Sequence, residues 1–128
     1  MDSPDPPHDR FDWPADKLNA LRLGRRLVTE VPASRPDRRA FVDVTPAGSP
    51  ADQRARDEGW VRGDPGRRFR LEHREYDGAR LDGFDHDIGA VLVASAEAAD
   101  ETGLLAVLTA WGLRPGAFAY PWETDDPR

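Results

Sequence analysis

The segment DGFDHDIG at residues 82–89 holds the densest group of side chains able to do chemistry, three aspartates and a histidine within six residues. Carboxylate oxygens are the ligands that hard divalent cations prefer, and histidine can act as a general base. Extended backbone would direct Asp85 and Asp87 to one side and His86 to the other. Glycines in and beside the segment disfavour a helix, the geometry that would bring Asp82 to the same face as Asp85 and His86. Either geometry supplies two or three ligands, so a metal site needs more from elsewhere.

The spacing of these acids does not match the calcium-binding loop of EF-hands. Counted from Asp82, acids occupy places one, four and six, and place twelve is Val93 instead of glutamate. A solvated turn, or a loop that contacts a partner protein, is therefore the favoured interpretation of the aspartate cluster (Asp82, Asp85 and Asp87). A metal site that also uses His86 is kept as the alternative, and no cofactor is expected.

The remaining candidates for catalysis are sparse. His73 lies on the apolar face of its predicted strand, where a histidine is a general base or, more often, a partly buried core residue. The segment GRRFR at 66–70, with Arg62 and Arg74, is either a phosphate site or an exposed strand face with Arg–Glu pairs. No serine lies in a G-x-S-x-G pattern, and the absence of cysteine excludes disulfides and thiolate chemistry. These features favour binding over catalysis.

Length and composition indicate one small domain. A chain of 128 residues has room for one core, and its apolar share of 38% is below the usual value of roughly 45–50%. The N-terminus lacks the pattern of a secretory signal, and no apolar run approaches the roughly 18 residues of a membrane span. We therefore expect a cytoplasmic protein. Seventeen arginines stand against one lysine (18 − 1 = 17), a bias of GC-rich coding that fits a bacterial source.

The net charge of −6 is unevenly distributed along the chain. Residues 1–19 carry five acids against two bases, giving −3, and residues 20–70 carry twelve arginines against seven acids, giving +5. Residues 71–128 carry twelve acids against four arginines, giving −8. An acidic half repels a nucleic-acid backbone and attracts basic partners. Much of this charge is equally well explained as ordinary solvated surface.

The order of predicted elements indicates an α+β fold, a mostly antiparallel sheet with one or two helices packed on one face. The single domain is expected to span residues 11–122. Residues 1–10, rich in proline and aspartate, are expected to form a disordered tail, and residues 123–128 a polar tail.

The first helix is expected to begin at Asp12–Trp13–Pro14, because a capping residue followed by proline favours a helix start. Two interpretations of its end stay open: the helix continues to Val31, or it ends near Gly24 and is succeeded by a strand at 26–31. The later elements, in chain order, are a strand at 39–46, a loop or short polar helix before residue 60, a half-exposed strand from Phe69 between the turns at 63–66 and 76–78, a central strand at 88–96, a helix from Asp100 that Gly112 and Pro115 stop, and a last strand at 117–122.

The leading hypothesis is a small acidic protein-binding module, most specifically an immunity or inhibitor protein that neutralises a toxin or other basic enzyme by occluding its active site. Complementary charge would speed association, and a few buried anchors would hold the complex. Trp122 is one such anchor, or else it closes the end of the core with Tyr120. The residues expected to contact the partner are Asp82, Asp85, Asp87, Glu97, Asp100, Glu101, Trp122 and Asp125.

Two other functions compete with this hypothesis. A small metal-dependent hydrolase would use the aspartate cluster as ligands and His73 or His86 as base. A structural subunit of a larger assembly would add the edges at 39–46 or 117–122 to the sheet of a partner. In every case we expect a monomer or homodimer that binds neither nucleic acid nor membrane.

Overall fold

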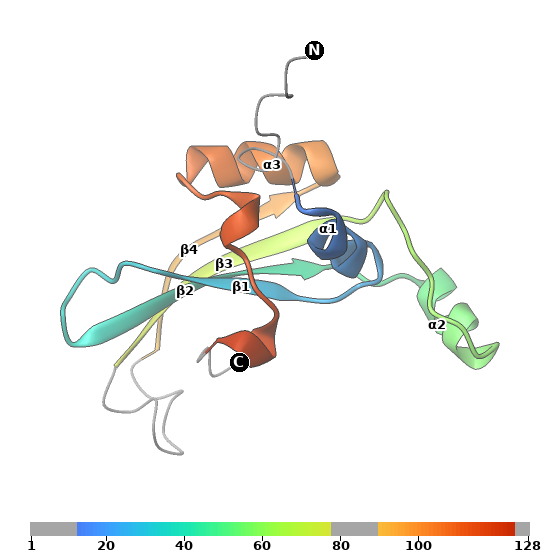
Figure 1. Cartoon of the computed structure of the whole chain (residues 1–128), viewed down its shortest axis with the longest axis horizontal. Coiled ribbons are helices and arrows are strands. Elements are labelled where there is room, and N and C mark those ends of the chain that lie inside the picture. Colours follow the sequence, from blue (N-terminus) through green and yellow to red (C-terminus); the bar gives the residue numbers. More distant parts are fainter. Residues whose placement is uncertain (1–12, 78–89, 125–128) are drawn as a thin grey trace, which may run out of the picture.

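The structure, a computed structural model, describes residues 13–77 and 90–124. Within these ranges one antiparallel sheet has the strand order β1-β2-β3-β4, so each strand pairs with the next in sequence (Figure 1). The predicted α+β class, with a mostly antiparallel sheet and helices, is confirmed. The elements are α1 (Ala15–Arg22), β1 (Leu27–Val31), β2 (Arg38–Pro46), α2 (Pro50–Asp57), β3 (Phe69–Asp77), β4 (Val91–Ala98) and α3 (Glu101–Ala110).

The first helix ends before Gly24 and a separate strand succeeds it, which decides between the two interpretations left open by the sequence. Gly24 has a φ of 87°, a left-handed conformation that glycine adopts without steric cost. Arg25 N then donates to Ala20 O at 2.9 Å and closes the helix end. The β-branched residues after Arg26 pair with β2 as the antiparallel strand β1.

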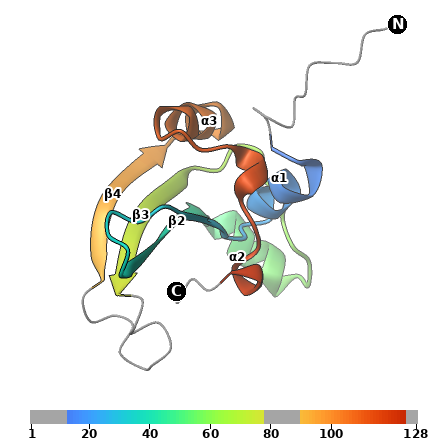
Figure 2. The ribbon, with the colours of Figure 1, turned by 60° about the vertical axis from the view of Figure 1, so that its left-hand side comes forward.

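The main core lies between one face of the sheet and the two helices α1 and α3. The sheet curves around these helices and the C-terminal segment, which all lie on its inner side, the helix-covered face (Figure 2). The buried residues of this core are Trp13, Ala20, Leu21, Leu27, Val42, Val44, Phe69, Leu71, Ala98, Leu104, Leu108 and Phe118. Burial of this apolar surface is the main favourable term in folding.

Strand β2 lies between β1 and β3, and packed side chains bury both of its faces. Val42 and Val44 belong to the helix-covered face, while Phe41 packs with Val28 and Tyr76 on the other face. The strand predicted at 39–46 is confirmed, and its side chains alternate between the two faces. Its position also means that the 39–46 segment, predicted as an edge able to extend a partner's sheet, is not an edge.

The 88–96 segment was predicted as a central strand, and this prediction is wrong. Its described part belongs to β4, the last strand of the sheet. Val91, Leu92 and Val93 expose 40%, 48% and 48% of their surface. A continuous apolar run indicates a strand buried on both faces, but an edge strand with exposed apolar side chains can have the same run. Periodicity does not separate these two cases.

The strand predicted at 117–122 is also absent. Its place is taken by two 3₁₀ turns, Pro115–Ala117 and Pro121–Glu123, and the described chain makes one isolated bridge there, between Val28 and Ala119. Each turn begins with a proline, which has no N–H for a sheet ladder and holds φ near −65°. The aromatic residues of AFAYPW gave a strand signal that these prolines override.

Replacing Gly24 with alanine should destabilise the protein by about 1–2 kcal/mol, because a β-carbon is unfavourable in the left-handed conformation. The added carbon itself would meet the Arg67 guanidinium at 3.7 Å, an ordinary contact, so the cost comes from the backbone. Gly48→Ala is the matched control, since a β-carbon there meets Asp52 at 3.8 Å and φ is not positive. Urea unfolding of both variants is the measurement. Equal stability of Gly24→Ala and wild type would contradict this account of the helix end.

Candidate functional site

The residues expected to contact a partner fall into three groups. The aspartate cluster and Asp125 lie outside the described residues, as does His86 of the alternative metal site, so their roles stay predictions. Glu97, Asp100 and Glu101 lie together where β4 ends and α3 begins. Trp122 lies in the C-terminal 3₁₀ turn, which is at the opposite end of the molecule from α3 in both views (Figures 1 and 2). The structure therefore does not place Trp122 beside the acids of the β4–α3 junction.

All three acids at this junction have partners inside the protein, and those of Asp100 and Glu101 are hydrogen bonds. Asp100 caps α3, and its Oδ1 accepts a hydrogen bond from Gly103 N at 2.8 Å. Glu101 accepts from Arg22 Nε at 2.8 Å and from Arg22 Nη2 at 2.9 Å, which joins the start of α3 to the end of α1 and raises the pKa of Arg22. Glu97 is largely exposed, with Arg70 Nη2 at 3.9 Å. Of the three, Glu97 is the most accessible to a partner.

Trp122 is an exposed aromatic residue, with 73% of its surface open to solvent. Its ring stacks on Tyr120 with centroids 4.8 Å apart and planes inclined by 2°. Lys17 Nζ lies 4.2 Å from the Tyr120 ring centroid, and the Tyr120 hydroxyl donates to Asp16 at 3.1 Å. Burial and the bond to Asp16 raise the pKa of Tyr120. Tyr120 packs on the core and Trp122 covers it from outside, so both predicted roles, anchor and core closure, fit this geometry.

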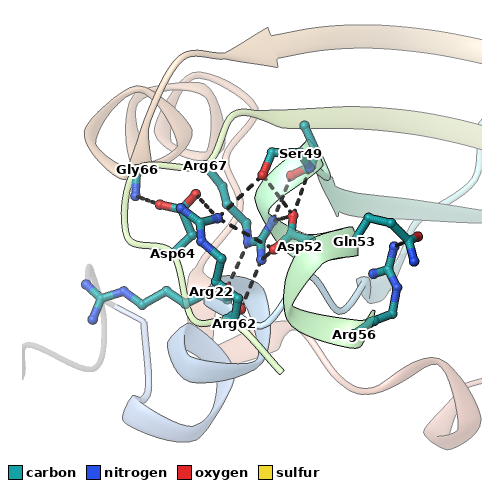
Figure 3. Close-up of polar contacts among 10 residues, drawn as sticks. Arg22, Ser49, Asp52, Gln53, Arg56, Arg62, Asp64, Gly66 and Arg67 are labelled. Carbon is teal, nitrogen blue, oxygen red and sulfur yellow. Dashed lines mark hydrogen bonds and ion pairs between the residues drawn. The ribbon is translucent and has the colours of Figure 1, made fainter. Parts of the chain in front are cut away.

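The basic segment GRRFR contains a buried arginine with a complete set of internal acceptors (Figure 3). Arg67 is 4% exposed, and its guanidinium makes a two-point contact with Asp52, Nη1 to Oδ2 at 2.7 Å and Nη2 to Oδ1 at 2.6 Å. The other contacts go to the carbonyl oxygens of Arg22 at 2.8 Å, Ala47 at 3.0 Å and Arg62 at 3.1 Å. Arginine has five N–H donors, and these five contacts use all of them.

Asp52 supplies the carboxylate that pairs with Arg67, and the two residues form the centre of a polar cluster with Ser49, Arg62 and Asp64. It occupies the third position of α2, where its Oδ2 also accepts from Ser49 N at 2.8 Å in a capping box. Hydrogen bonds from Arg67 and Ser49 hold the pKa of Asp52 well below its usual range. Arg62 Nη1 lies 2.8 Å from Asp64 Oδ2 and 3.6 Å from Asp52 Oδ1. The cluster is thus a structural junction, and neither Arg67 nor Arg62 is free to bind a phosphate.

The two edges of the sheet differ in how they are covered. At the β1 edge, Val28 N donates to Ala119 O at 3.0 Å and Ala119 N donates to Val28 O at 2.8 Å. At the β4 edge, no segment of the described chain pairs with the outer side of the strand. Edge strands are usually protected by charged side chains or proline. Strand β4 has neither in its first half, and its one charged residue is Glu97.

Strand β4 also carries a β-bulge near its centre. His73 of β3 pairs with Ala94 and the next residue, Arg74, pairs with Leu92, so Val93 is an extra residue on β4. The bulge lies within the exposed apolar part of the strand. We call the unpaired outer side of this strand, with the exposed residues Val91, Leu92 and Val93, the β4 edge.

The described part of the chain holds few side chains arranged for catalysis or metal binding. Among residues 13–77 and 90–124 no group of three or more His, Asp or Glu side chains is placed to hold a metal ion. No helix in these ranges has the length and apolar character needed to cross a membrane. His73 lies on the helix-covered face and is partly buried, as predicted, and it contributes to the wall of a pocket.

Replacing Arg67 with methionine should destabilise the protein by about 3 kcal/mol or more, because the Asp52 carboxylate would stay buried without its partner. The control is Arg39→Met, which removes an exposed two-point pair with Glu30 at 2.7 and 2.8 Å and should cost less than about 1 kcal/mol. Urea unfolding monitored by circular dichroism gives both values. Similar losses in the two variants would show that Arg67 has no special role.

The ion pair should also make stability depend on pH. The folded pKa of Asp52 is below its unfolded value of about 3.9, so its contribution is present above about pH 4 and is lost as the pH falls towards the folded pKa. Asp52→Asn should be less stable at pH 7 and should lose less stability between pH 5 and pH 3 than wild type does. The urea midpoint of both proteins across this range is the measurement. Parallel pH curves would contradict the assignment.

Comparison with known proteins finds no protein family whose model matches the chain, no similar curated protein and no similar solved structure. The fold and the placement of side chains are therefore the basis for a functional proposal. The junction of Arg67 and Asp52 is internal and has no free donor. Trp60, Val61 and Trp122 are also exposed, but within the described residues the β4 edge combines three consecutive exposed apolar residues with a strand side that no other strand pairs.

Proposed function

We propose that this protein is a small protein-binding module whose β4 edge accepts a strand or apolar surface of its partner. In its most specific form it is an immunity or inhibitor protein that occludes the active site of a basic enzyme. The observation that carries the proposal is the open β4 edge, with three consecutive apolar residues between 40% and 48% exposed. An added strand gains main-chain hydrogen bonds along the edge, and apolar side chains supply specificity.

The contrast between the two sheet edges supports this use of β4. The chain covers the β1 edge with its own C-terminal segment through Ala119, so one edge is protected internally. The β4 edge lacks the lysine, proline or inward charge that usually blocks pairing with other chains. An edge left in this state is a recognition element or an aggregation hazard, and a partner that covers it removes the hazard.

Charge supports the choice of a basic partner. The aspartate cluster precedes β4 in sequence, and Glu97 lies near the end of the strand, so acidic residues occur on both sides of the apolar stretch. Residues 71–128 as a whole carry −8. Such a field accelerates association with a positively charged protein and repels polyanions. The buried Arg67 guanidinium is paired with Asp52 and adds no free positive charge to the surface.

The partner can be identified by placing a photo-crosslinking amino acid at Leu92 and, as a control, at Thr109, which is exposed on α3. Leu92 should give a crosslink to one basic protein in cells of the source organism, and Thr109 should not. The purified partner should then lose its enzymatic activity at a 1:1 ratio. Equal crosslinking from both positions would argue against a specific edge.

With the purified partner, Leu92→Lys combined with Val93→Lys should weaken binding about a hundredfold, since both residues lie in the centre of the proposed contact. Thr109→Lys carries the same type of charge change and should leave affinity unchanged. Raising the salt concentration from about 0.05 to 0.5 M should slow association about tenfold. An association rate that does not depend on salt would rule out a charge-steered inhibitor of a basic enzyme, even if the double variant binds weakly. Unchanged affinity of the double variant would rule out the β4 edge.

A further inference from the structure

A pocket of about 350 Å³ opens on the helix-covered face, next to the C-terminal end of α3. This volume is near the lower end of the usual range for small-molecule sites. The described residues that line the pocket include no carboxylate, lysine or arginine. The side chains that define it are Val31, Val42, His73, Ala94, Trp111 and Leu113.

The pocket is built from regular elements and not from a loose loop. Val42, His73 and Ala94 form one row across β2, β3 and β4, because His73 pairs with Val42 on one side and with Ala94 on the other. The opposite wall comes from the end of α3. Gly112, with a φ of 72°, ends the helix, and Leu113 N turns back to donate to Leu108 O at 2.8 Å. Trp111 and Leu113 are thereby held over the sheet.

His73 is the one polar side chain of this wall with an unmet hydrogen-bonding need. Its Nε2 is buried and has no hydrogen-bond partner within residues 13–77 and 90–124. A buried polar atom without a partner costs stability and calls for an explanation, such as a ligand. The imidazole is partly exposed, and a 180° rotation of the ring exchanges Nε2 with Cε1, so either edge can face the pocket.

The β-bulge lies beside this histidine, since the register shift falls between His73 and Arg74. Bulges are frequent next to functional sites, where they change the direction of a side chain. A bulge, an unsatisfied imidazole nitrogen and an indole therefore meet at one apolar pocket. None of these features depends on the proposed partner protein.

We propose that this pocket binds a small uncharged ring compound that carries one hydrogen-bonding group, of the indole or phenol class. The aliphatic side chains and Trp111 enclose the ring, and the ring heteroatom or hydroxyl exchanges a hydrogen bond with the His73 imidazole. Because no lysine or arginine is among the described lining residues, an uncharged ligand is preferred over one that carries a carboxylate. The volume is large enough for one such ring system.

The test is an NMR titration of the full chain with indole, phenol, toluene and benzoate, monitoring the indole signal of Trp111 and the imidazole signals of His73. Indole and phenol should shift both sets of signals and saturate with dissociation constants on the order of 1 mM. Benzoate should bind more weakly. Toluene should bind through the apolar walls alone.

Two variants separate the walls from the imidazole. Ala94→Leu places a bulky side chain beside His73 in the pocket and should abolish binding of all the uncharged probes, whereas Ser95→Leu, exposed on the opposite face of the same strand, should leave it intact. His73→Phe keeps a planar aromatic ring but removes both ring nitrogens, so it should weaken binding of phenol and indole about fivefold while toluene is unaffected. Absence of saturation at about 10 mM in the wild type, or binding that survives in a folded Ala94→Leu protein, would overturn the proposal.

Discussion

The buried ion pair of Arg67 and Asp52 attaches helix α2, which lies outside the apolar core, to the rest of the protein. Helix α2 contributes no residue to either apolar cluster, so its attachment to the sheet depends on polar groups. The Arg67 guanidinium reaches the end of α1, the end of β2, α2 and the connection before β3 in one set of five contacts. Burying two charges is costly, and complete pairing offsets that cost. The arrangement fixes one geometry for four segments.

This internal use of charge changes how the composition of the protein should be understood. Arg22 with Glu101, Arg26 with Asp43 and Arg67 with Asp52 connect elements to one another. The chain is rich in arginine in its middle, yet many of these cations neutralise acids of the same molecule. The apolar surface that remains exposed on β4 is then the more informative feature for recognition, because no internal contact in the described chain accounts for it.

Local signals in the sequence were sufficient for much of the fold and for little of the candidate site. The alternation from Phe69 and the cap and stop residues around α3 predicted β3 and α3, since those rules act over a few residues. The position of β4 at an edge depends on the order of the strands in the sheet, and no local sequence pattern specifies that order. The partnership of Arg67 with Asp52 was missed for the same reason. The SPAD sequence at 49–52 marks a capping box, but nothing nearby says which arginine will reach it.

The contact between Ala119 and Val28 has a consequence for the time course of folding in the cell. Ninety-one residues separate the two (119 − 28 = 91), so the β1 edge stays unpaired until nearly all of the described chain has left the ribosome. At typical rates of synthesis this interval is roughly 5 to 20 s. The sheet itself joins neighbours in sequence and can assemble during this time. The nascent chain therefore passes through a stage in which both edge strands, β1 and β4, are open to pairing with other molecules.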